Sequence, residues 1–384
     1  MNVIIAGDYC PRNRTAALFK AEDYQSVLGE VKNVICEADY SIINLECPVV
    51  EREATPIEKC GPNLRCNKKG IEALKWLGCD CVTLANNHFY DYGESGVEDT
   101  LMACESMQID YVGGGKDLTD ASQILYIERK NKKLAIINCC EHEFSIATET
   151  TGGSNPLNIV SQYNAIQEAR EKADFVLVIV HGGVELFWLP SKRMKETYRF
   201  FIDVGADVVI NHHQHCYSGY EVYKNKPIFY GLGNFCFDKP SDNHGDYRWT
   251  SGYMVRIKFE DSNKVKYDII PYRQCAEEPM VELLGEGREK NDFLSNLEAY
   301  NVIIADDKKR EIEYLKWCQQ TEGMYKSILN PVYNRYTAWF FNSNIGNRII
   351  SKRKLLQTLD YISNESHVER VRLFVERKCR NNRD

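Results

Sequence analysis

The sequence predicts a layered α/β fold over residues 1–275, followed by a helical extension over 276–384. Short apolar runs without alternating polar residues recur along the first part, which is typical of strands buried on both faces. Segments with the apolar spacing of a helix lie between several of them. Because the two kinds of segment alternate, we expect the order strand, helix, strand around a sheet core.

The first two strands are expected at Val3–Ala6 and Ser41–Asn44, and each leads into a carboxylate. Asp8 follows the first strand and Glu46 follows the second. Leu18–Ala38 has helical spacing of its apolar residues, which predicts one helix between the two strands.

The next strand follows a polar loop at Glu51–Asn67. Lys69–Leu77 predicts a helix that ends at Gly78, because glycine readily takes the left-handed conformation of a helix end. The strand itself is expected at Cys81–Leu84. It leads into three polar residues, namely Asn87, His88 and Asp91.

The middle of the chain continues the pattern. A helix, a glycine turn and three strands are expected, in that order, at Val97–Met107, Gly113–Gly115, Ile124–Ile127, Leu134–Asn138 and Phe175–Val180. The last of these strands leads into His181 and Glu185, with two glycines between them that allow close approach of the backbone. Tyr253–Phe259 and Val265–Ile270 alternate well enough to predict a closing hairpin.

A short strand at Val208–Ile210 leads into three histidines within four positions, His212, His213 and His215. Imidazoles two residues apart just past a strand face the same ion if the backbone bends there, and neutral imidazole is the commonest side-chain metal ligand. The alternative is a polar turn of hydrogen-bonded histidines, and the ends of the other strands favour the metal site.

Those strand ends carry oxygen and nitrogen donors, and in layered α/β folds the carboxyl ends of the strands share one edge, where sites are built. Such donors without clustered thiolates favour Mn²⁺, Fe²⁺ or Zn²⁺. About six ligands shared by two ions would leave room for water and substrate, which favours hydrolysis without a serine or cysteine nucleophile. The candidate donors are Asp8, Glu46, Asn87, His181, His213 and His215, with His88 beside them.

Composition limits the partners. The chain has 384 residues, a net charge of -7 and basic residues mixed with acidic ones, so a nucleic-acid partner is not favoured. Its 15 cysteines include several within apolar segments, and it begins directly at the first expected strand, so we expect a cytoplasmic protein. No segment approaches the roughly 18 apolar residues of a membrane-spanning helix.

Five motifs together resemble a known family. They are Gly7-Asp8, Asn44-Leu45-Glu46, LANNHxxDYG at Leu84–Gly93, HxGxE at His181–Glu185, and GADxVIxHHxH through EVYxxKPIxYxLGNFxFD at Gly205–Asp238. This set is similar to the bacterial capsule-synthesis CapA family, also called the poly-gamma-glutamate capsule family, a branch of the calcineurin-like metallophosphoesterases. The resemblance covers roughly Met1–Arg273.

The resemblance implies a metallophosphatase-like α-β-β-α sandwich, with two facing mixed sheets flanked by helices. It implies that the six donors bind two divalent ions and that Glu46 bridges them. It also implies that His88 lies beside the site, where it protonates a leaving oxygen or binds the substrate anion, with Asp91 orienting it. Arg12 and Glu185 are expected to contact the substrate, although a solvated loop charge is the alternative for Arg12.

Three departures from the family pattern concern the shape of the site. The broader superfamily begins with Asp-x-His, and Asp8-Tyr9-Cys10 lacks that histidine, as this branch generally does. His181-Gly182-Gly183 stands where HWG is usual, and Asn211-His212-His213-Gln214-His215 stands where Gly-His-His-Pro-His is usual. These changes bear on the substrate wall and on the turn that aims the two histidines.

Other polar residues receive structural interpretations. His212 is expected to support the ligands or shape the turn rather than to bind a metal ion. His142 is expected to lie at the same edge or on the surface, and Arg14 to be a solvated loop charge or an anion contact. Asn234 and Asp238 are expected to shape the turn beneath the site. Lys239–Thr250, with His244 and Arg248, is a candidate lid.

The extension lies outside the resemblance. We expect helices at Glu278–Asn301 and Lys308–Ser327, an aromatic segment at Tyr333–Phe341 and a basic helical tail. That tail is either a solvated helix face or a peripheral contact with a membrane surface or acidic partner.

The favoured function is a metal-dependent, phosphoesterase-like hydrolase in capsule, poly-gamma-glutamate or exopolysaccharide biosynthesis. It would act on an anionic polymer or a phosphorylated precursor. The alternative is a non-catalytic component that binds the polymer or assembles the capsule machine.

Overall fold

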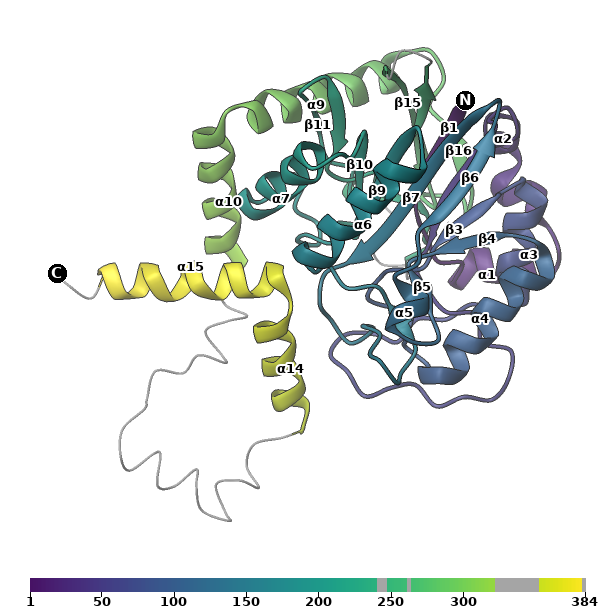
Figure 1. Cartoon of the computed structure of the whole chain (residues 1–384), viewed down its shortest axis with the longest axis horizontal. Coiled ribbons are helices and arrows are strands. Elements are labelled where there is room, and N and C mark those ends of the chain that lie inside the picture. The colour runs from purple at the N-terminus through teal and green to yellow at the C-terminus, as the bar shows by residue number, and fades with distance from the viewer. Residues whose placement is uncertain (240–246, 261–263, 322–351, 382–384) are drawn as a thin grey trace.

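The computed structural model describes residues 1–239, 247–260, 264–321 and 352–381, which form an α-β-β-α sandwich (Figure 1). Two mixed sheets face each other, and helices cover their outer faces. The predicted fold class is therefore confirmed. The aromatic segment Tyr333–Phe341 and most of the candidate lid, including His244, lie outside the described residues.

The first sheet has eight strands in the order β16-β15-β14-β1-β2-β3-β4, and β13 pairs with β1 beside this path. Strands β1 to β4 are parallel to one another and to β13, so their carboxyl ends meet at one edge, whereas β14, β15 and β16 are antiparallel additions. The bounds are β1 Asn2–Tyr9, β2 Tyr40–Leu45, β3 Cys81–Thr83, β4 Asp110–Val112, β13 Asn234–Cys236, β14 Ser251–Phe259, β15 Val265–Gln274 and β16 Val281–Leu283.

The second sheet has six strands in the order β11-β12-β10-β9-β7-β6. Its central strands β7, β9, β10 and β12 are parallel, and β6 and β11 are antiparallel edge strands. The bounds are β6 Leu125–Arg129, β7 Lys132–Cys140, β9 Phe175–His181, β10 Val208–His212, β11 Tyr220–Tyr223 and β12 Lys226–Phe229. Within the turn predicted at Gly113–Gly115, Gly114–Gly115 instead forms β5, which pairs with β8 at Gly153–Ser154.

Successive side chains along a strand point to opposite faces of its sheet. The apolar side chains therefore form three layers of core: one between the sheets and one on the outer face of each sheet. In β1, Val3 and Ile5 lie in the core between the sheets, whereas Ile4 and Ala6 face the helices on the outside of the first sheet. The helices around the sheets are α1 Asn13–Lys20, α2 Tyr24–Cys36, α3 Lys68–Leu77, α4 Gly93–Met107, α5 Leu118–Ala121, α6 Ile159–Lys172, α7 Lys192–Asp203 and α8 Tyr247–Thr250.

The single helix predicted at Leu18–Ala38 is wrong, because α1 and α2 are separate helices. Glu22 between them has a φ of 61°, and the Asp23 side chain accepts a hydrogen bond from the Ser26 amide as the N-cap of α2. The predicted end of α3 is confirmed, since Gly78 is left-handed with a φ of 90°.

The described helices of the extension pack on the sandwich. The helix predicted from Glu278 starts later, because Val281–Leu283 pairs with β15 as strand β16. Helix α9 buries Phe293 in the core between the sheets, and α10 buries Tyr314 against the second sheet's outer layer. The extension's helices are α9 Arg288–Ala305, α10 Asp307–Thr321, α14 Lys352–Ser363 and α15 Glu365–Asn381.

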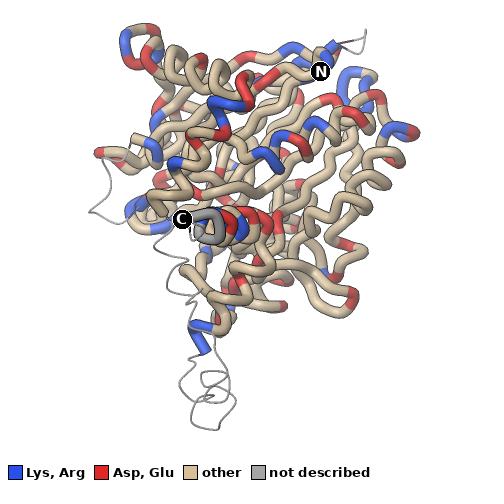
Figure 2. Tube along the Cα trace, turned by 90° about the vertical axis from the view of Figure 1, so that its left-hand side faces the viewer, with Lys and Arg blue, Asp and Glu red and all other residues tan. Residues whose placement is uncertain are grey.

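Acidic and basic residues are interspersed along the trace, including α15, whose tube shows both colours (Figure 2). No helix within the described ranges is both long and apolar enough to cross a membrane. The division of the chain at residues 275 and 276 stays a prediction, as does the membrane contact of the basic tail.

Candidate metal centre

The six predicted ligands converge where parallel strands of both sheets end. The two sheets present these ends to each other, so donors that are far apart in sequence meet in one place. Asp8 lies in β1, Glu46 directly after β2, Asn87 after β3, His181 at the end of β9, and His213 and His215 after β10.

Two groups of donors share one carboxylate. Glu46, His181 and His213 form the first group, and Asp8, Glu46 and His215 form the second; within each group the ligand atoms all lie within 4.8 Å of one another. Glu46 therefore occupies the position that a bridging carboxylate would take. The predicted bridging role is consistent with this geometry and stays a prediction.

The spacing between donors suits shared ions. Glu46 Oε1 lies 3.5 Å from His181 Nε2 and 3.5 Å from His215 Nε2. His213 Nδ1 lies 3.1 Å from His181 Nε2, and Asn87 Oδ1 lies 3.0 Å from the same nitrogen. Two ligand atoms that each lie about 2.1 Å from the same ion stand about 3 to 3.5 Å from each other, so these separations fit donors that share an ion.

A strained turn after β10 aims the last two histidines. His213 and His215 have φ values of 89° and 54°, in the left-handed region that non-glycine residues rarely adopt. Gln214 between them donates from Nε2 to the Phe187 carbonyl at 2.8 Å. Asn211 at the start of the turn donates to the Gly182 carbonyl at 2.9 Å. These two residues depart from the family pattern, and here their side chains hold the turn in place.

The donor cluster fits divalent cations electrostatically. Glu46 is fully buried, and neither of its oxygens has a hydrogen-bond donor within the described residues. Burial, and then the neighbouring Asp8, hold the pKa of Glu46 well above its usual range. Burial and the surrounding histidines hold the pKa of His181 well below its usual range. Neutral imidazole nitrogens and a buried carboxylate without a hydrogen-bond partner are the kinds of ligand that bind divalent cations.

Asn44 orients this cluster, and the sequence interpretation gave it no role. Its Nδ2 donates to Asp8 Oδ1 at 2.7 Å and lies 3.3 Å from His181 Nδ1. Its own Oδ1 accepts from Thr83 Oγ1 at 3.0 Å. Its place two residues before Glu46 in the second motif was the available signal. Asn234, expected to shape a turn, holds His215 in the same way, with Oδ1 lying 2.9 Å from His215 Nδ1.

His88 lies beside the donors in a buried triad. Its Nδ1 is 2.7 Å from Asp91 Oδ2 and 3.1 Å from Lys59 Nζ, and Lys59 also pairs with Asp91. Burial and then Lys59 lower the pKa of His88 to about 4. A neutral ring with its Nδ1–H facing Asp91 presents Nε2 as an acceptor, which favours taking a proton over giving one. Lys59 was missed because it lies in a polar loop without a motif.

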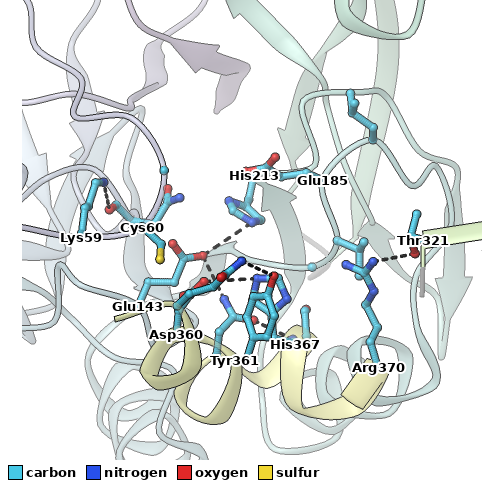
Figure 3. A pocket seen from close by; sticks show the side chains of 18 of the residues that line it. Lys59, Cys60, Glu143, Glu185, His213, Thr321, Asp360, Tyr361, His367 and Arg370 are labelled. Atoms are coloured by element: carbon cyan, nitrogen blue, oxygen red, sulfur yellow. Dashed lines mark hydrogen bonds and ion pairs between the residues drawn. The ribbon is translucent and has the colours of Figure 1, made fainter. Parts of the chain in front are cut away.

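A cavity of about 610 Å³ adjoins the donors (Figure 3). His88, Glu185 and His213 line it from the sandwich, and Asp360 and His367 line it from the extension. Glu185 is exposed to solvent there. The structure thus places the predicted substrate contact Glu185 in a cavity next to the donors.

Arg12 lies elsewhere. Its guanidinium stands over the Phe237 ring at 6.0 Å, and it lines a separate hollow with Arg52 and Arg65. Phe237 in turn packs edge-on against His215 at 5.2 Å between ring centroids, so Arg12 approaches the donors from behind this ring. Its predicted contact with substrate stays a prediction.

Two of the remaining polar candidates are hydrogen-bonded to acidic side chains. Arg14 Nη2 donates to Asp238 Oδ1 at 2.7 Å, and the Arg14 amide donates to Asp238 Oδ2 at 2.8 Å. His142 is partly exposed and faces Glu365 of α15, with 2.5 Å between Nδ1 and Oε1. His212 is buried with Nδ1 3.5 Å from Asp8 Oδ1, and it lies outside both donor groups.

Comparisons with known proteins agree with the motifs. The sequence model of the family described as "Bacterial capsule synthesis protein PGA_cap" matches residues 2–239. The capsule biosynthesis protein CapA of Bacillus anthracis is 29% identical over 297 residues, which cover 75% of this chain and 71% of that protein. The PGA biosynthesis protein CapA of Bacillus subtilis is 30% identical over 250 residues, covering 64% of each chain.

Two further matches are more distant. A protein of Mycobacterium tuberculosis described as a probable polyglutamine synthesis accessory protein is 26% identical over 231 residues, covering 56% of this chain and 60% of its own. The solved structure of the calcineurin-like phosphoesterase YfkN from Bacillus subtilis is similar over 78% of this chain and 98% of that chain, with 13% identity and a TM-score of 0.37.

Proposed function

The chain belongs to the bacterial capsule synthesis protein PGA_cap family, and from this premise we propose that it is a metal-dependent, phosphoesterase-like hydrolase in the synthesis of a capsule, poly-gamma-glutamate or exopolysaccharide. One observation carries the proposal. Glu46, buried and without a hydrogen-bond donor among the described residues, is shared by two groups of donors, as a carboxylate between two ions would be.

Two divalent ions of manganese, iron or zinc would lower the pKa of bound water and stabilise the negative charge of a phosphoryl group. Asp8, Glu46, Asn87 and the three histidines of the donor set would hold them. His88 takes up or holds a proton at Nε2, and Asp91 and Lys59 fix its ring. The cavity walls orient the substrate and limit its access to bulk water.

The substrate would be a phosphorylated precursor of the polymer or the anionic polymer itself, and the proposal includes no nucleic-acid partner. We place the reaction in the cytoplasm. The cysteines that the structure describes are free thiols and mostly buried, as expected in a reducing compartment.

A second candidate function is a non-catalytic component that binds the polymer or assists its assembly. The description of the Mycobacterium tuberculosis relative as an accessory protein favours it. The complete donor set favours catalysis, because a binding protein has no need for two groups of buried donors around one carboxylate.

Hydrolysis of a generic aryl phosphodiester, with and without added Mn²⁺, tests the proposal. Asp8→Ala and His213→Ala should abolish metal-dependent turnover, and the exposed Glu30→Ala in α2 is the matched control that should retain it. If both donor variants restore polymer production in a deletion strain while lacking metal, the accessory function is the better account.

A further inference from the structure

The extension forms one wall of the cavity next to the donors. Helices α14 and α15 meet at Asn364 in a sharp corner (Figure 1), and this helix pair, residues 352–381, is called the hairpin below. Figure 3 shows Asp360, Tyr361, His367 and Arg370 projecting from these two helices, while His213 and Glu185 come from the opposite side. The family match ends at residue 239, so this wall is a feature of the chain outside the matched region.

The hairpin is held against the residues that follow β7. Ser366 Oγ donates to Glu141 Oε2 at 2.7 Å, and Asn364 Nδ2 donates to Glu143 Oε1 at 2.9 Å. The backbone amide of His142 donates to Glu365 Oε2 at 2.8 Å. Three consecutive residues of the sandwich thus each bind the hairpin.

The residues that bind the hairpin lie directly beside the metal-ligand donors. Glu143 Oε1, which accepts from the hairpin, is 3.9 Å from His213 Nε2. At the other end of the cavity wall, Arg370 Nη2 donates to Thr321 Oγ1 at 2.7 Å, which joins α15 to the end of α10. The hairpin is therefore tied at both ends of the wall, and the donors face it across the cavity.

We propose that this hairpin completes the substrate cavity and makes it selective for a small ester whose distal group, the group on the side away from the metal ions, is neutral or cationic. The inference rests on the proposed function and names the substrate class of the same site. A volume of about 610 Å³ holds a small molecule or one end of a chain.

The charges around the cavity give the direction of this selectivity. Glu143 and Glu185 from the sandwich and Asp360 from the hairpin all line it. Two cations line it as well: the Lys59 ammonium is engaged by Asp91 and His88, and the Arg370 guanidinium donates to Thr321 Oγ1. An anionic group held by the metal ions would leave the rest of the substrate facing these carboxylates. The interior of a polyanion would bring a second negative charge against them.

The ionisation of Asp360 sets the conditions of the test. Burial raises the pKa of Asp360 to about 6. At pH 8 Asp360 is therefore ionised, and its replacement by asparagine removes a charge at nearly constant shape.

Three p-nitrophenyl phosphodiesters with one leaving group and different distal groups test the inference. They carry choline (cationic), ethyl (neutral) and carboxyethyl (anionic) as the second ester group. With Mn²⁺ at pH 8 we expect kcat/KM to fall in that order. Asp360→Asn should lower the choline-to-carboxyethyl ratio about fivefold, the effect of one partly solvated charge at short range. The control Asp292→Asn, on the exposed face of α9, should leave the ratio unchanged.

Protection of Cys60 gives a readout that does not depend on turnover. Cys60 lines the cavity and is partly exposed, whereas Cys36 lies on the exposed surface of α2. Phosphorylcholine should slow maleimide labelling of Cys60 and leave labelling of Cys36 unchanged, and phosphoglycolate should protect Cys60 less. Asp360→Asn should reduce the difference between the two ligands.

The outcomes separate the two claims. Metal-dependent turnover with equal kcat/KM for all three esters, and no effect of Asp360→Asn on either readout, would overturn the selectivity while leaving the hydrolase intact. Absence of turnover with any ester would count against the hydrolase, and the Cys60 pattern would still decide the selectivity. Equal protection of Cys60 by both ligands would overturn it.

Discussion

Replacing Glu46 with glutamine should stabilise the metal-free protein and remove its response to metal. In the metal-free state both Glu46 oxygens are buried without donors among the described residues, beside the carboxylate of Asp8. A buried group left unsatisfied costs about 1 to 3 kcal/mol, and more if it is charged. The amide that replaces the carboxylate carries no charge, so we expect Glu46→Gln to gain about 1 to 2 kcal/mol without metal.

When metal is added, wild-type protein should become more stable than Glu46→Gln. A ligand at 100 times its Kd stabilises the native state by about 2.7 kcal/mol, and Glu46 belongs to both donor groups. Wild-type protein should therefore gain at least that free energy of unfolding with Mn²⁺, whereas Glu46→Gln should gain much less. Thermal unfolding in EDTA and across a Mn²⁺ titration measures both effects, and each 1 kcal/mol corresponds to about 2 °C or less in Tm for a chain of this length.

The pH dependence gives the sign of the metal-free effect. The pKa of Glu46 is raised in the folded protein, so the folded state binds its proton more tightly than the unfolded state. Glu46 therefore does not destabilise the folded protein below its unfolded-state pKa of about 4.5, and it destabilises the folded protein increasingly as pH rises above that value. The advantage of Glu46→Gln should thus be small near pH 4.5 and larger at pH 7. The exposed Glu30→Gln is the control. Equal stabilisation of wild type and Glu46→Gln by metal would refute the reasoning.

Three further predictions concern the frame of the site. Gly7→Ala should cost about 3 kcal/mol or more in urea denaturation, because its Cβ would lie 1.8 Å from a backbone carbonyl oxygen, and a cost below about 1 kcal/mol would contradict this. Asn44→Ala should weaken metal binding about 10- to 100-fold by calorimetry, because it frees Asp8, and an unchanged Kd would contradict that role. Glu365, and also Glu141, raise the pKa of His142, so the His142–Glu365 pair should stabilise the docked hairpin fully below about pH 6.5 and less as pH rises through that raised pKa. Proteolysis across pH 6 to 8 should therefore cleave the hairpin faster at higher pH. A pH-independent rate, or the same trend in Glu365→Gln, would contradict this role of the pair.

The donor set was predictable because it follows from local patterns. Each donor lies at or just past the end of an apolar run, and parallel strands put those ends on one edge. Nothing beyond the strand pattern and the motif spacing was needed to bring Asp8, Glu46 and His213 together. The break between α1 and α2 was not predictable from apolar spacing alone, because one N-cap residue, Asp23, decides it.

The cavity wall was not predictable, because its contacts join distant parts of the chain. Asn364 binds Glu143 across 221 positions, and Ser366 binds Glu141 across 225. Neither pair has a local signal, since a polar residue at a helix start usually caps its own helix. The basic tail was therefore interpreted by composition alone, which does not reveal that Arg370 is buried.

Metal content measured together with turnover tests the central claim most directly. The purified protein, loaded with Mn²⁺ and desalted, is subjected to elemental analysis and then assayed with an aryl phosphodiester, beside Glu46→Gln and Glu30→Gln. We expect about two ions per chain and metal-dependent turnover for wild type and Glu30→Gln, and loss of both for Glu46→Gln. Wild-type protein that binds no metal above the level of Glu46→Gln, or that hydrolyses the ester equally well in EDTA, would contradict the account.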